Sequence, residues 1–185
     1  MAKVLMPLAN GFEELEAIAV IDVLRRGGVQ VVTASIHDTL EVWSAHDVCQ
    51  KADALFADVE DEPFDAIVLP GGGEGTGNLR NCAALIERLR RQHMEGRLLC
   101  AICAAPTVLV EAGVVDPDLQ ITCYPSCQED LDREWTPAPV VVDGKVITGQ
   151  APGTALLFAF VVLQTLVGVP TAEQVAAGMV TDVLM

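Results

Sequence analysis

Residues 98–106 read Leu98-Leu99-Cys100-Ala101-Ile102-Cys103-Ala104-Ala105-Pro106, which predicts a strand, a sharp turn and a helix in succession. Residues 98–102 are all apolar, as in a strand that is buried on both faces of a parallel sheet. Small residues follow Cys103, and Pro106 suits the first turn of a helix, where its missing N–H is not needed. Such an elbow lifts the Cys103 side chain out of the sheet. The stretch therefore predicts an α/β fold with a thiol at the carboxyl end of a central strand.

Strand-like and helix-like segments alternate on both sides of this stretch, which is typical of a mostly parallel sheet. The expected strands are residues 3–8, 29–35, 66–69, 97–102, 120–123, 140–142 and 145–149, with a small hairpin at 43–51. The expected helices are residues 13–26, 78–95, one that begins near 104, 153–167 and 171–179. No linker, repeat or low-complexity tract interrupts the pattern, so we expect a single domain over residues 1–185.

The charge balance argues against one class of partner. The 185-residue chain has 11 Lys and Arg against 26 Asp and Glu, a formal net charge of −15. Nucleic acid binding requires clustered Lys and Arg to neutralise phosphates. We therefore expect no nucleic-acid partner, and a solvated acidic surface that keeps the protein soluble.

One uncharged segment leaves an alternative open. Residues 149–172 carry no charge, and their apolar run at 155–163 could just span a bilayer. Pro152, Gly153, Gly168 and Pro170 interrupt the segment, and no basic residue follows to anchor its end. We interpret the segment as a helix that is buried in the core or at a dimer interface, and expect no membrane association.

The N-terminus and the cysteines indicate a compartment. Acidic residues follow the first apolar run too early for a signal peptide, so we expect a cytoplasmic protein. In that reducing compartment the six cysteines do not predict a disulfide framework.

Three segments are expected to meet at the carboxyl edge of the sheet, where ligands bind in open α/β folds. They are Asn10–Glu16, Pro70–Gly77 and Ile102–Pro106. The helix N-terminus behind Cys103 favours a thiolate, and the glycines after Leu69 can offer backbone N–H donors as an oxyanion hole. The alternative is that Cys103 is a small buried hydrophobic residue, as free cysteines often are.

A carboxyl group can complete this site. Glu13 and Glu14 suit the first turn of a helix as partners of its dipole, whereas Glu16 lies among apolar residues where the helix turns inward. Burial beside a thiolate would raise the pKa of Glu16. A protonated Glu16 would then donate a hydrogen bond to sulfur.

Four motifs together resemble the ThiJ/PfpI superfamily, in the branch of the Parkinsonism-associated deglycase (DJ-one) and bacterial ThiJ/YajL. They are residues 10–16 (NGFEELE), 69–72 (LPGG), 101–106 (AICAAP) and 151–154 (APGT), in the order seen in that superfamily. The resemblance implies a flavodoxin-like sandwich with helices on both faces of the sheet. It implies an oxidisable nucleophile at Cys103, a protonated partner at Glu16, and backbone donors at Gly72 and Ala104. It also implies a homodimer through the first helix, near Arg25 or Arg26. We expect neither a cofactor nor a metal.

The chain departs from the superfamily pattern at one position. Many members carry a histidine near the cysteine, where this sequence has Tyr124, so a Cys–His dyad is not expected. The chain has three histidines, His37, His46 and His93. Of these, only His46, in the expected hairpin, is placed to approach an active site, and that site could belong to a partner subunit. A surface imidazole is the simpler interpretation of His46.

Other site chemistries fit less well. Cys100, Cys103, Cys123 and Cys127 have spacings that suggest zinc, but residues three apart on a strand point to opposite faces. Peptidase-type relatives carry a histidine directly after the nucleophile, where this chain has Ala104.

Two hypotheses for the function remain. The first is a cysteine-dependent deglycase or glutathione-independent glyoxalase, which acts on methylglyoxal, glyoxal or early glycation adducts on proteins. The second is a redox-sensing or chaperone-like protein of oxidative stress, in which Cys103 is oxidised to the sulfinic acid with little turnover.

Overall fold

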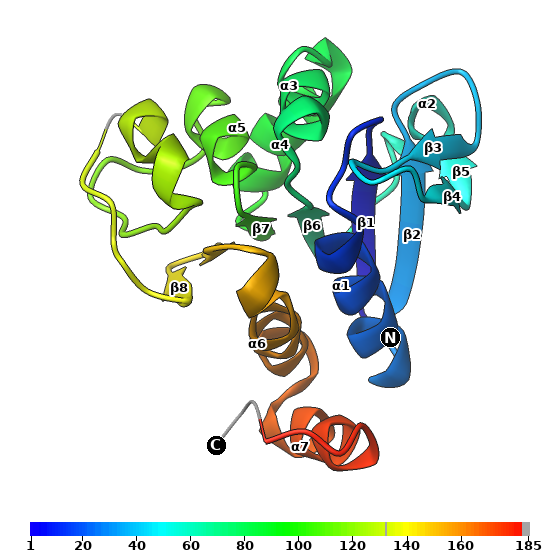
Figure 1. The fold of residues 1–185 in the computed structure, drawn as a ribbon, viewed down its shortest axis with the longest axis vertical. Helices are drawn as coiled ribbons and strands as arrows, with labels where there is room; N and C mark the ends of the chain where they lie inside the picture. Colours follow the sequence, from blue (N-terminus) through cyan, green and yellow to red (C-terminus); the bar gives the residue numbers. More distant parts are fainter. Residues whose placement is uncertain (132, 183–185) are drawn as a thin grey trace.

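The computed structural model describes residues 1–131 and 133–182. They form a seven-stranded sheet, with the strand order β5-β2-β1-β6-β7-β9-β8, and helices that pack against it (Figure 1). The strands are β1 (Lys3–Leu8), β2 (Gln30–Ser35), β5 (Ala54–Leu55), β6 (Ala66–Leu69), β7 (Leu98–Ile102), β8 (Val140–Asp143) and β9 (Val146–Gly149). Neighbouring strands run parallel except β8, which is antiparallel to β9. A separate antiparallel hairpin joins β3 (Glu41–Trp43) to β4 (Cys49–Lys51). The mostly parallel, flavodoxin-like α/β sheet predicted from the sequence is confirmed.

Helices cover both faces of the sheet because side chains along each strand alternate between two cores. Val4, Met6 and Leu8 of β1 belong to one core, with α1 (Glu14–Arg26), α6 (Ala155–Val167) and α7 (Val169–Gly178). Leu5 belongs to the other, with α2 (Phe56–Val59), α3 (Gly73–Arg80), α4 (Ala83–Met94) and α5 (Pro106–Glu111). Burying each such Val, Leu or Met side chain contributes about 1.5–3 kcal/mol.

The structure corrects two expected elements. The helix expected at 78–95 is two helices, α3 and α4, separated at Asn81 and Cys82, and α3 begins earlier than expected because the chain is helical from Gly73. Residues 120–123 form no strand: the backbone there makes only an isolated bridge between Ile121 and Trp135. A 3-10 helix, η1 (Pro125–Leu131), follows.

The uncharged segment forms a short helix packed against the sheet. A 3-10 turn, η2 (Pro152–Thr154), precedes α6, and Gly168 ends α6 with φ 91°, a left-handed backbone that favours glycine. Phe158, Phe160 and Leu163 are fully buried. In the described part of the chain, no helix is long and apolar enough to cross a membrane.

The chain reverses its direction across the sheet between β1 and β6. Ligands in such folds bind at the carboxyl ends of the strands beside this reversal. The segments expected to meet there do meet, since the N–H of Glu13 donates to the carbonyl of Gly71 at 3.0 Å. The hairpin β3–β4 lies against the same edge, where the N–H of Gly11 donates to the carbonyl of Trp43 at 2.7 Å.

Candidate active site

Cys103 sits on a strained elbow directly after β7. Its φ is 64°, a left-handed conformation that costs a non-glycine residue about 1–2 kcal/mol. Two hydrogen bonds hold it there: its N–H donates to Gly149 O at 3.0 Å, and its carbonyl accepts from Tyr124 N–H at 2.7 Å. Pro106 is at the start of α5, as predicted. Backbone strain of this kind is typical of functional positions.

Glu16 is the carboxyl group beside this thiol. Its side chain is fully buried, and its Oε2 accepts the N–H of Gly71 at 2.7 Å. Its other oxygen, Oε1, is buried and has no partner among the described residues at hydrogen-bond distance and angle. A Cβ placed on Gly71 would lie 2.7 Å from Cys103 Cβ and 2.8 Å from Glu16 Oε2, so both side chains press against the same glycine. Glu16 is therefore in position to exchange a proton with Cys103.

Burial sets the charge state of this pair. It raises the pKa of Glu16 to about 7, and the neighbouring charge of Glu13 adds to the rise. Burial, followed by the charge of Glu16, raises the pKa of the Cys103 thiol to about 12. The elbow therefore does not make Cys103 a resting thiolate while Glu16 is ionised, contrary to the expectation from the helix N-terminus. Above a pH of about 7 the pair therefore holds a single negative charge, and the thiolate forms when the proton moves from sulfur to Glu16.

Two backbone N–H groups meet the thiol. Those of Gly72 and Ala104 hydrogen-bond with Cys103 and act to lower its pKa. Gly72 has φ 92°, and a Cβ there would lie 2.2 Å from the carbonyl oxygen of Gly11, so only glycine fits. These are the two donors expected from the resemblance, and the structure brings both to Cys103.

Sequence reasoning missed Gly71 as a part of the site. It provides the N–H that binds Glu16 and the space in which Glu16 and Cys103 meet. Three consecutive glycines follow Pro70, and nothing in that run distinguishes Gly71 from its neighbours. Its role depends on the approach of α1, which only the fold reveals.

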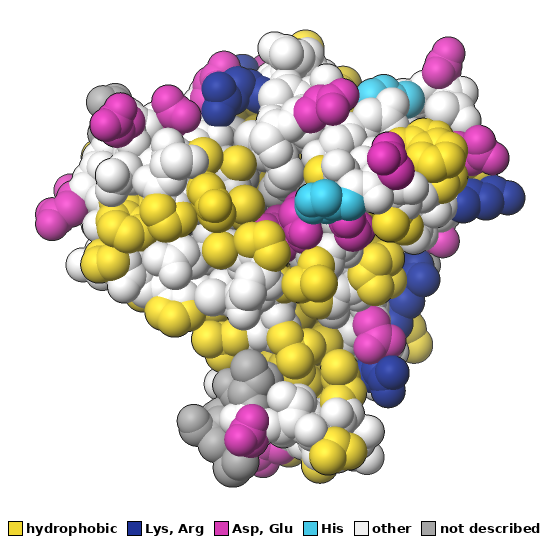
Figure 2. Space-filling model, viewed as in Figure 1, with side chains coloured by type: hydrophobic (Ala, Val, Ile, Leu, Met, Phe, Trp, Pro, Cys, Tyr) yellow, Lys and Arg dark blue, Asp and Glu magenta, His cyan; other side chains and the backbone are white. Residues whose placement is uncertain are grey.

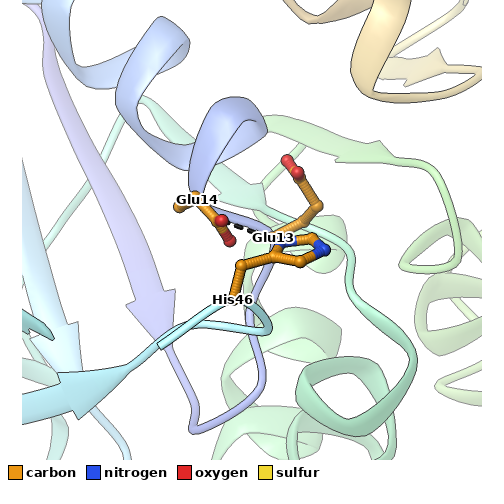
Figure 3. A group of neighbouring side chains, drawn as sticks. All are labelled: Glu13, Glu14 and His46. Carbon is orange, nitrogen blue, oxygen red and sulfur yellow. Dashed lines mark hydrogen bonds and ion pairs between the residues drawn. The ribbon is translucent and has the colours of Figure 1, made fainter. Parts of the chain in front are cut away.

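His46 and Tyr124 do not contact the thiol through side-chain hydrogen bonds in this chain. His46 is exposed on the turn of the β3–β4 hairpin, and its Nδ1 pairs with Glu14 Oε1 at 2.8 Å (Figure 3). The side chain of Tyr124 is 43% exposed, and its link to the elbow is its backbone N–H. This geometry fits the simpler of the two interpretations of His46, a surface imidazole rather than a residue that approaches an active site.

Among the residues that the structure describes, the cysteines with zinc-like spacing do not form a group of ligand atoms that could hold a metal. Cys100 is buried in β7, burial raises the pKa of its thiol, and all six cysteines are free. Among the described residues, Glu13, Glu14 and His46 are the group whose ligand atoms, all within 4.8 Å of one another, could hold a metal.

Sequence comparison identifies relatives over nearly the whole chain. The profile of the DJ-1/PfpI family matches residues 2–165. The protein dj-1beta of Drosophila melanogaster is 38% identical over 178 residues, which cover 95% of each chain. Glutathione-independent glyoxalase DJR-1.2 of Caenorhabditis elegans is 36% identical over 170 residues, 90% of this chain and 89% of that protein. The chain spans less than half of the Arabidopsis thaliana DJ-1 homologs A and B, to which it is 38% identical.

Solved structures agree with this assignment. The oxidized DJ-1 of Toxoplasma gondii superposes with a TM-score of 0.94 at 36% identity, covering 98% of this chain and 100% of that one. The Drosophila DJ-1beta crystal structure gives a TM-score of 0.93 at 37% identity, covering 97% and 98%. On the matching profile, the relatives and the shared fold, the chain belongs to the DJ-1/PfpI family.

Proposed function

We propose that the chain is a cysteine-dependent glyoxalase, which converts methylglyoxal and glyoxal to hydroxy acids without glutathione. Early glycation adducts of these aldehydes on proteins would be a second substrate class, which makes the protein a deglycase as well. The observation that carries the proposal is the Cys103 elbow with Glu16 and two backbone N–H donors at the thiol. The name of the Caenorhabditis relative, a glutathione-independent glyoxalase, supports it.

The first step is addition of sulfur to the aldehyde. The Cys103 proton moves to the Glu16 carboxylate, and Sγ forms a bond to the aldehyde carbon. Negative charge then develops on the aldehyde oxygen, where backbone N–H donors near Cys103 can stabilise it. Return of the proton from Glu16 to this oxygen gives a neutral hemithioacetal.

The second step is an internal oxidation and reduction. A base takes the proton from the carbon bonded to sulfur, the hydroxyl proton on that carbon moves to the ketone oxygen, and a proton is returned to the ketone carbon. The former aldehyde carbon becomes a thioester and the ketone becomes an alcohol, so no external oxidant is needed. Water then breaks the carbon–sulfur bond, which releases lactate from methylglyoxal and restores the thiol.

The base for the second step is expected to limit the rate. Glu16, with its pKa near 7, is the group available inside the subunit. Wild-type protein should therefore convert methylglyoxal to lactate slowly without glutathione. Tyr124→His, which installs an imidazole where many relatives have one, should raise kcat with little change in KM. Lactate production measured by an enzyme-coupled assay tests both.

A neighbouring variant provides the control. Ser126→His adds an imidazole two positions further along the chain, at an exposed position of η1, and should leave the rate unchanged. If wild type gives no lactate and Tyr124→His creates none, the glyoxalase proposal is wrong.

The second candidate function is that of a redox-sensing or chaperone-like protein, in which oxidation of Cys103 is the signal. It is favoured by the buried Glu16 beside the thiol, and the Toxoplasma relative is described as oxidized. A Cys103 sulfinate would keep Glu16 protonated by adding negative charge, and the protonated acid would hydrogen-bond the sulfinate. Oxidation of Cys103 by mild peroxide should therefore stop at the sulfinic acid, which intact-mass measurements show as a gain of two oxygens.

Glu16→Ala should remove this plateau, so that oxidation continues to the sulfonate. An exposed carboxylate such as Glu87 provides the control, because Glu87→Ala leaves the thiol environment intact. Equal oxidation of wild type and Glu16→Ala would show that Glu16 does not protect the sulfinate.

We also propose that the protein is a homodimer through α1. Leu15 is 57% exposed and Ile18 is 43% exposed on α1, and Val48 on the hairpin is 49% exposed. Hydrophobic side chains gather on this face of the molecule over α1 and α6 (Figure 2). The apolar residues of α6 are buried or half-buried, whereas Leu15 and Ile18 of α1 are exposed. Large exposed apolar patches are typical of interfaces.

Light scattering at micromolar concentration should give twice the chain mass of 19.6 kDa. Ile18→Glu should shift the mass toward one chain, because the new charge would have to be buried. Val142→Glu, which alters an equally apolar but separate exposed residue on β8, should not. A wild-type mass near that of one chain would exclude the dimer.

A further inference from the structure

Two further thiols, Cys123 and Cys127, lie behind the elbow and have no role in the chemistry proposed above. Both side chains pack against the core on the side of the sheet that α5 covers, whereas Cys103 belongs to the core on the opposite side. Cys123 is fully buried, Cys127 is half-buried, and both are free. The sheet therefore separates these two thiols from the reactive one.

A single carbonyl oxygen, that of Tyr124, brings the two cysteines together. The thiol of Cys123 donates to it at 3.2 Å, and the N–H of Cys127 donates to it at 2.8 Å. The second bond closes a four-residue turn, and such a turn holds its end Cα atoms within about 7 Å. Burial, followed by the charge of Cys127, raises the pKa of the Cys123 thiol to about 12, so the two groups are near enough to interact. A disulfide needs Cα atoms about 4.4–6.8 Å apart, which a small tightening of this turn provides.

The same segment holds the elbow of Cys103. The N–H of Tyr124 donates to the Cys103 carbonyl at 2.7 Å. That carbonyl and the N–H of Ala104 belong to one planar peptide unit. The Ala104 N–H hydrogen-bonds the Cys103 thiol and acts to lower its pKa. A movement of Tyr124 therefore turns a hydrogen-bond donor at the thiol, because the left-handed backbone of Cys103 is strained and kept in place by such bonds.

The residues before the turn are attached to the sheet through side chains. Residues 120–123 form no strand, and the N–H of Thr122 donates to the hydroxyl of Thr148 at 2.9 Å. The indole Nε1 of Trp135 donates to the carbonyl of Cys123 at 3.2 Å. A strand inside a sheet is fixed by a ladder of backbone hydrogen bonds, whereas side-chain contacts such as these can adjust. The turn can therefore tighten without breaking the sheet.

We propose that Cys123 and Cys127 are a redox pair, which closes to a disulfide and thereby slows the reactions of Cys103. Hydrogen peroxide transfers one oxygen to the half-buried thiol of Cys127, which becomes a sulfenic acid, and the other oxygen leaves as water. The Cys123 sulfur then attacks the Cys127 sulfur. The S–S bond forms, the S–O bond breaks, and the hydroxyl leaves with the Cys123 proton as a second water. The Cys123 thiol no longer donates to Tyr124, and the turn tightens.

Proteolysis isolates the pair for a direct test. Cleavage after glutamate releases residues 112–129, which contain Cys123 and Cys127 and no other cysteine. Diamide replaces peroxide in this test because it forms disulfides and adds no oxygen to Cys103. It should remove the mass of two hydrogens from this peptide in most molecules, and dithiothreitol should restore them. A peptide that keeps its mass, or one that is linked to the peptide of Cys103, would overturn the proposal.

Alkylation of Cys103 by iodoacetamide measures the effect on the elbow. After diamide is removed, the rate constant in wild type should fall severalfold, because the thiol pKa rises when the Ala104 donor turns away. Without oxidation, Cys123→Ser and Cys127→Ser should react as wild type does, since a hydroxyl at position 123 can still donate to Tyr124. Diamide should leave the rate constant of both variants unchanged. This loss of response distinguishes the pair from residues with a structural role only.

Cys82→Ser is the matched control, because Cys82 is also half-buried but precedes α4. Diamide should slow its alkylation as it does in wild type. If residues 112–129 are oxidised and the rate constant of Cys103 stays the same, the pair does not act on the elbow. If the rate constant falls equally in both serine variants of the pair, another cysteine is responsible. Either result would contradict the proposal.

Discussion

Cys103→Ser is expected to reduce the conversion of methylglyoxal to lactate to the uncatalysed rate. A serine hydroxyl is a far weaker nucleophile than a thiol at neutral pH, and Glu16, with a pKa of about 7, is too weak a base to activate it. The loss in kcat/KM should be about a thousandfold or more. The measurement is lactate formation by purified variant and wild type at equal concentration.

Cys49→Ser is the matched control, because Cys49 is exposed on β4 and has no part in the site. It should keep wild-type activity. The hydroxyl fits the space of the thiol, so circular dichroism of Cys103→Ser should match wild type. Retained activity in Cys103→Ser would mean that another residue is the nucleophile.

Glu16→Gln is expected to stabilise the fold at pH 8 while it impairs catalysis. The pKa of Glu16 is about 7 in the folded protein, against 4.5 for an ordinary glutamate. The folded state therefore binds the Glu16 proton more tightly than the unfolded chain does. The resulting stability is fully present below pH 4.5 and is lost as the pH rises through 7. That difference corresponds to about 3 kcal/mol between the two limits.

The glutamine variant lacks this ionisation, and its amide oxygen can still accept the N–H of Gly71. Relative to wild type, its Tm should therefore rise between pH 5 and pH 8. Its kcat/KM should fall about a hundredfold, because an amide cannot accept the thiol proton. Denaturation followed by circular dichroism at the two pH values, together with the lactate assay, measures both effects. A Tm difference that is independent of pH would contradict the raised pKa of Glu16.

The sequence was sufficient to predict the frame of the site. The apolar residues of β7, the small residues after Cys103 and the helix start at Pro106 predict the elbow, and the left-handed Cys103 confirms it. The pairing of Glu16 with Cys103 was also predictable, because an acidic residue on the inward face of α1 must meet the carboxyl edge of β1 and β6. The spacing of apolar residues along the sequence identifies such helices and strands, because burial of one face determines that spacing.

Other features depend on contacts between distant segments. The glycines of α3 disfavour a helix, yet Gly75 is needed there because a Cβ would lie 2.7 Å from the nitrogen of Phe12. Thr122 was expected in a strand, but its N–H bonds to the Thr148 hydroxyl instead of a strand partner. The thiol pKa could not be predicted from a helix N-terminus alone, because burial and Glu16 outweigh the donors.

The number of lactate molecules produced per chain tests the central claim most directly. Wild-type protein is mixed with a large excess of methylglyoxal in the absence of glutathione, and lactate is counted by proton NMR while intact mass follows adducts on Cys103. The proposed cycle restores the thiol after each hydrolysis, so lactate should accumulate far beyond one molecule per chain with little permanent adduct. A stable adduct on Cys103 with less than one lactate per chain would contradict the enzyme and favour the redox-sensing alternative.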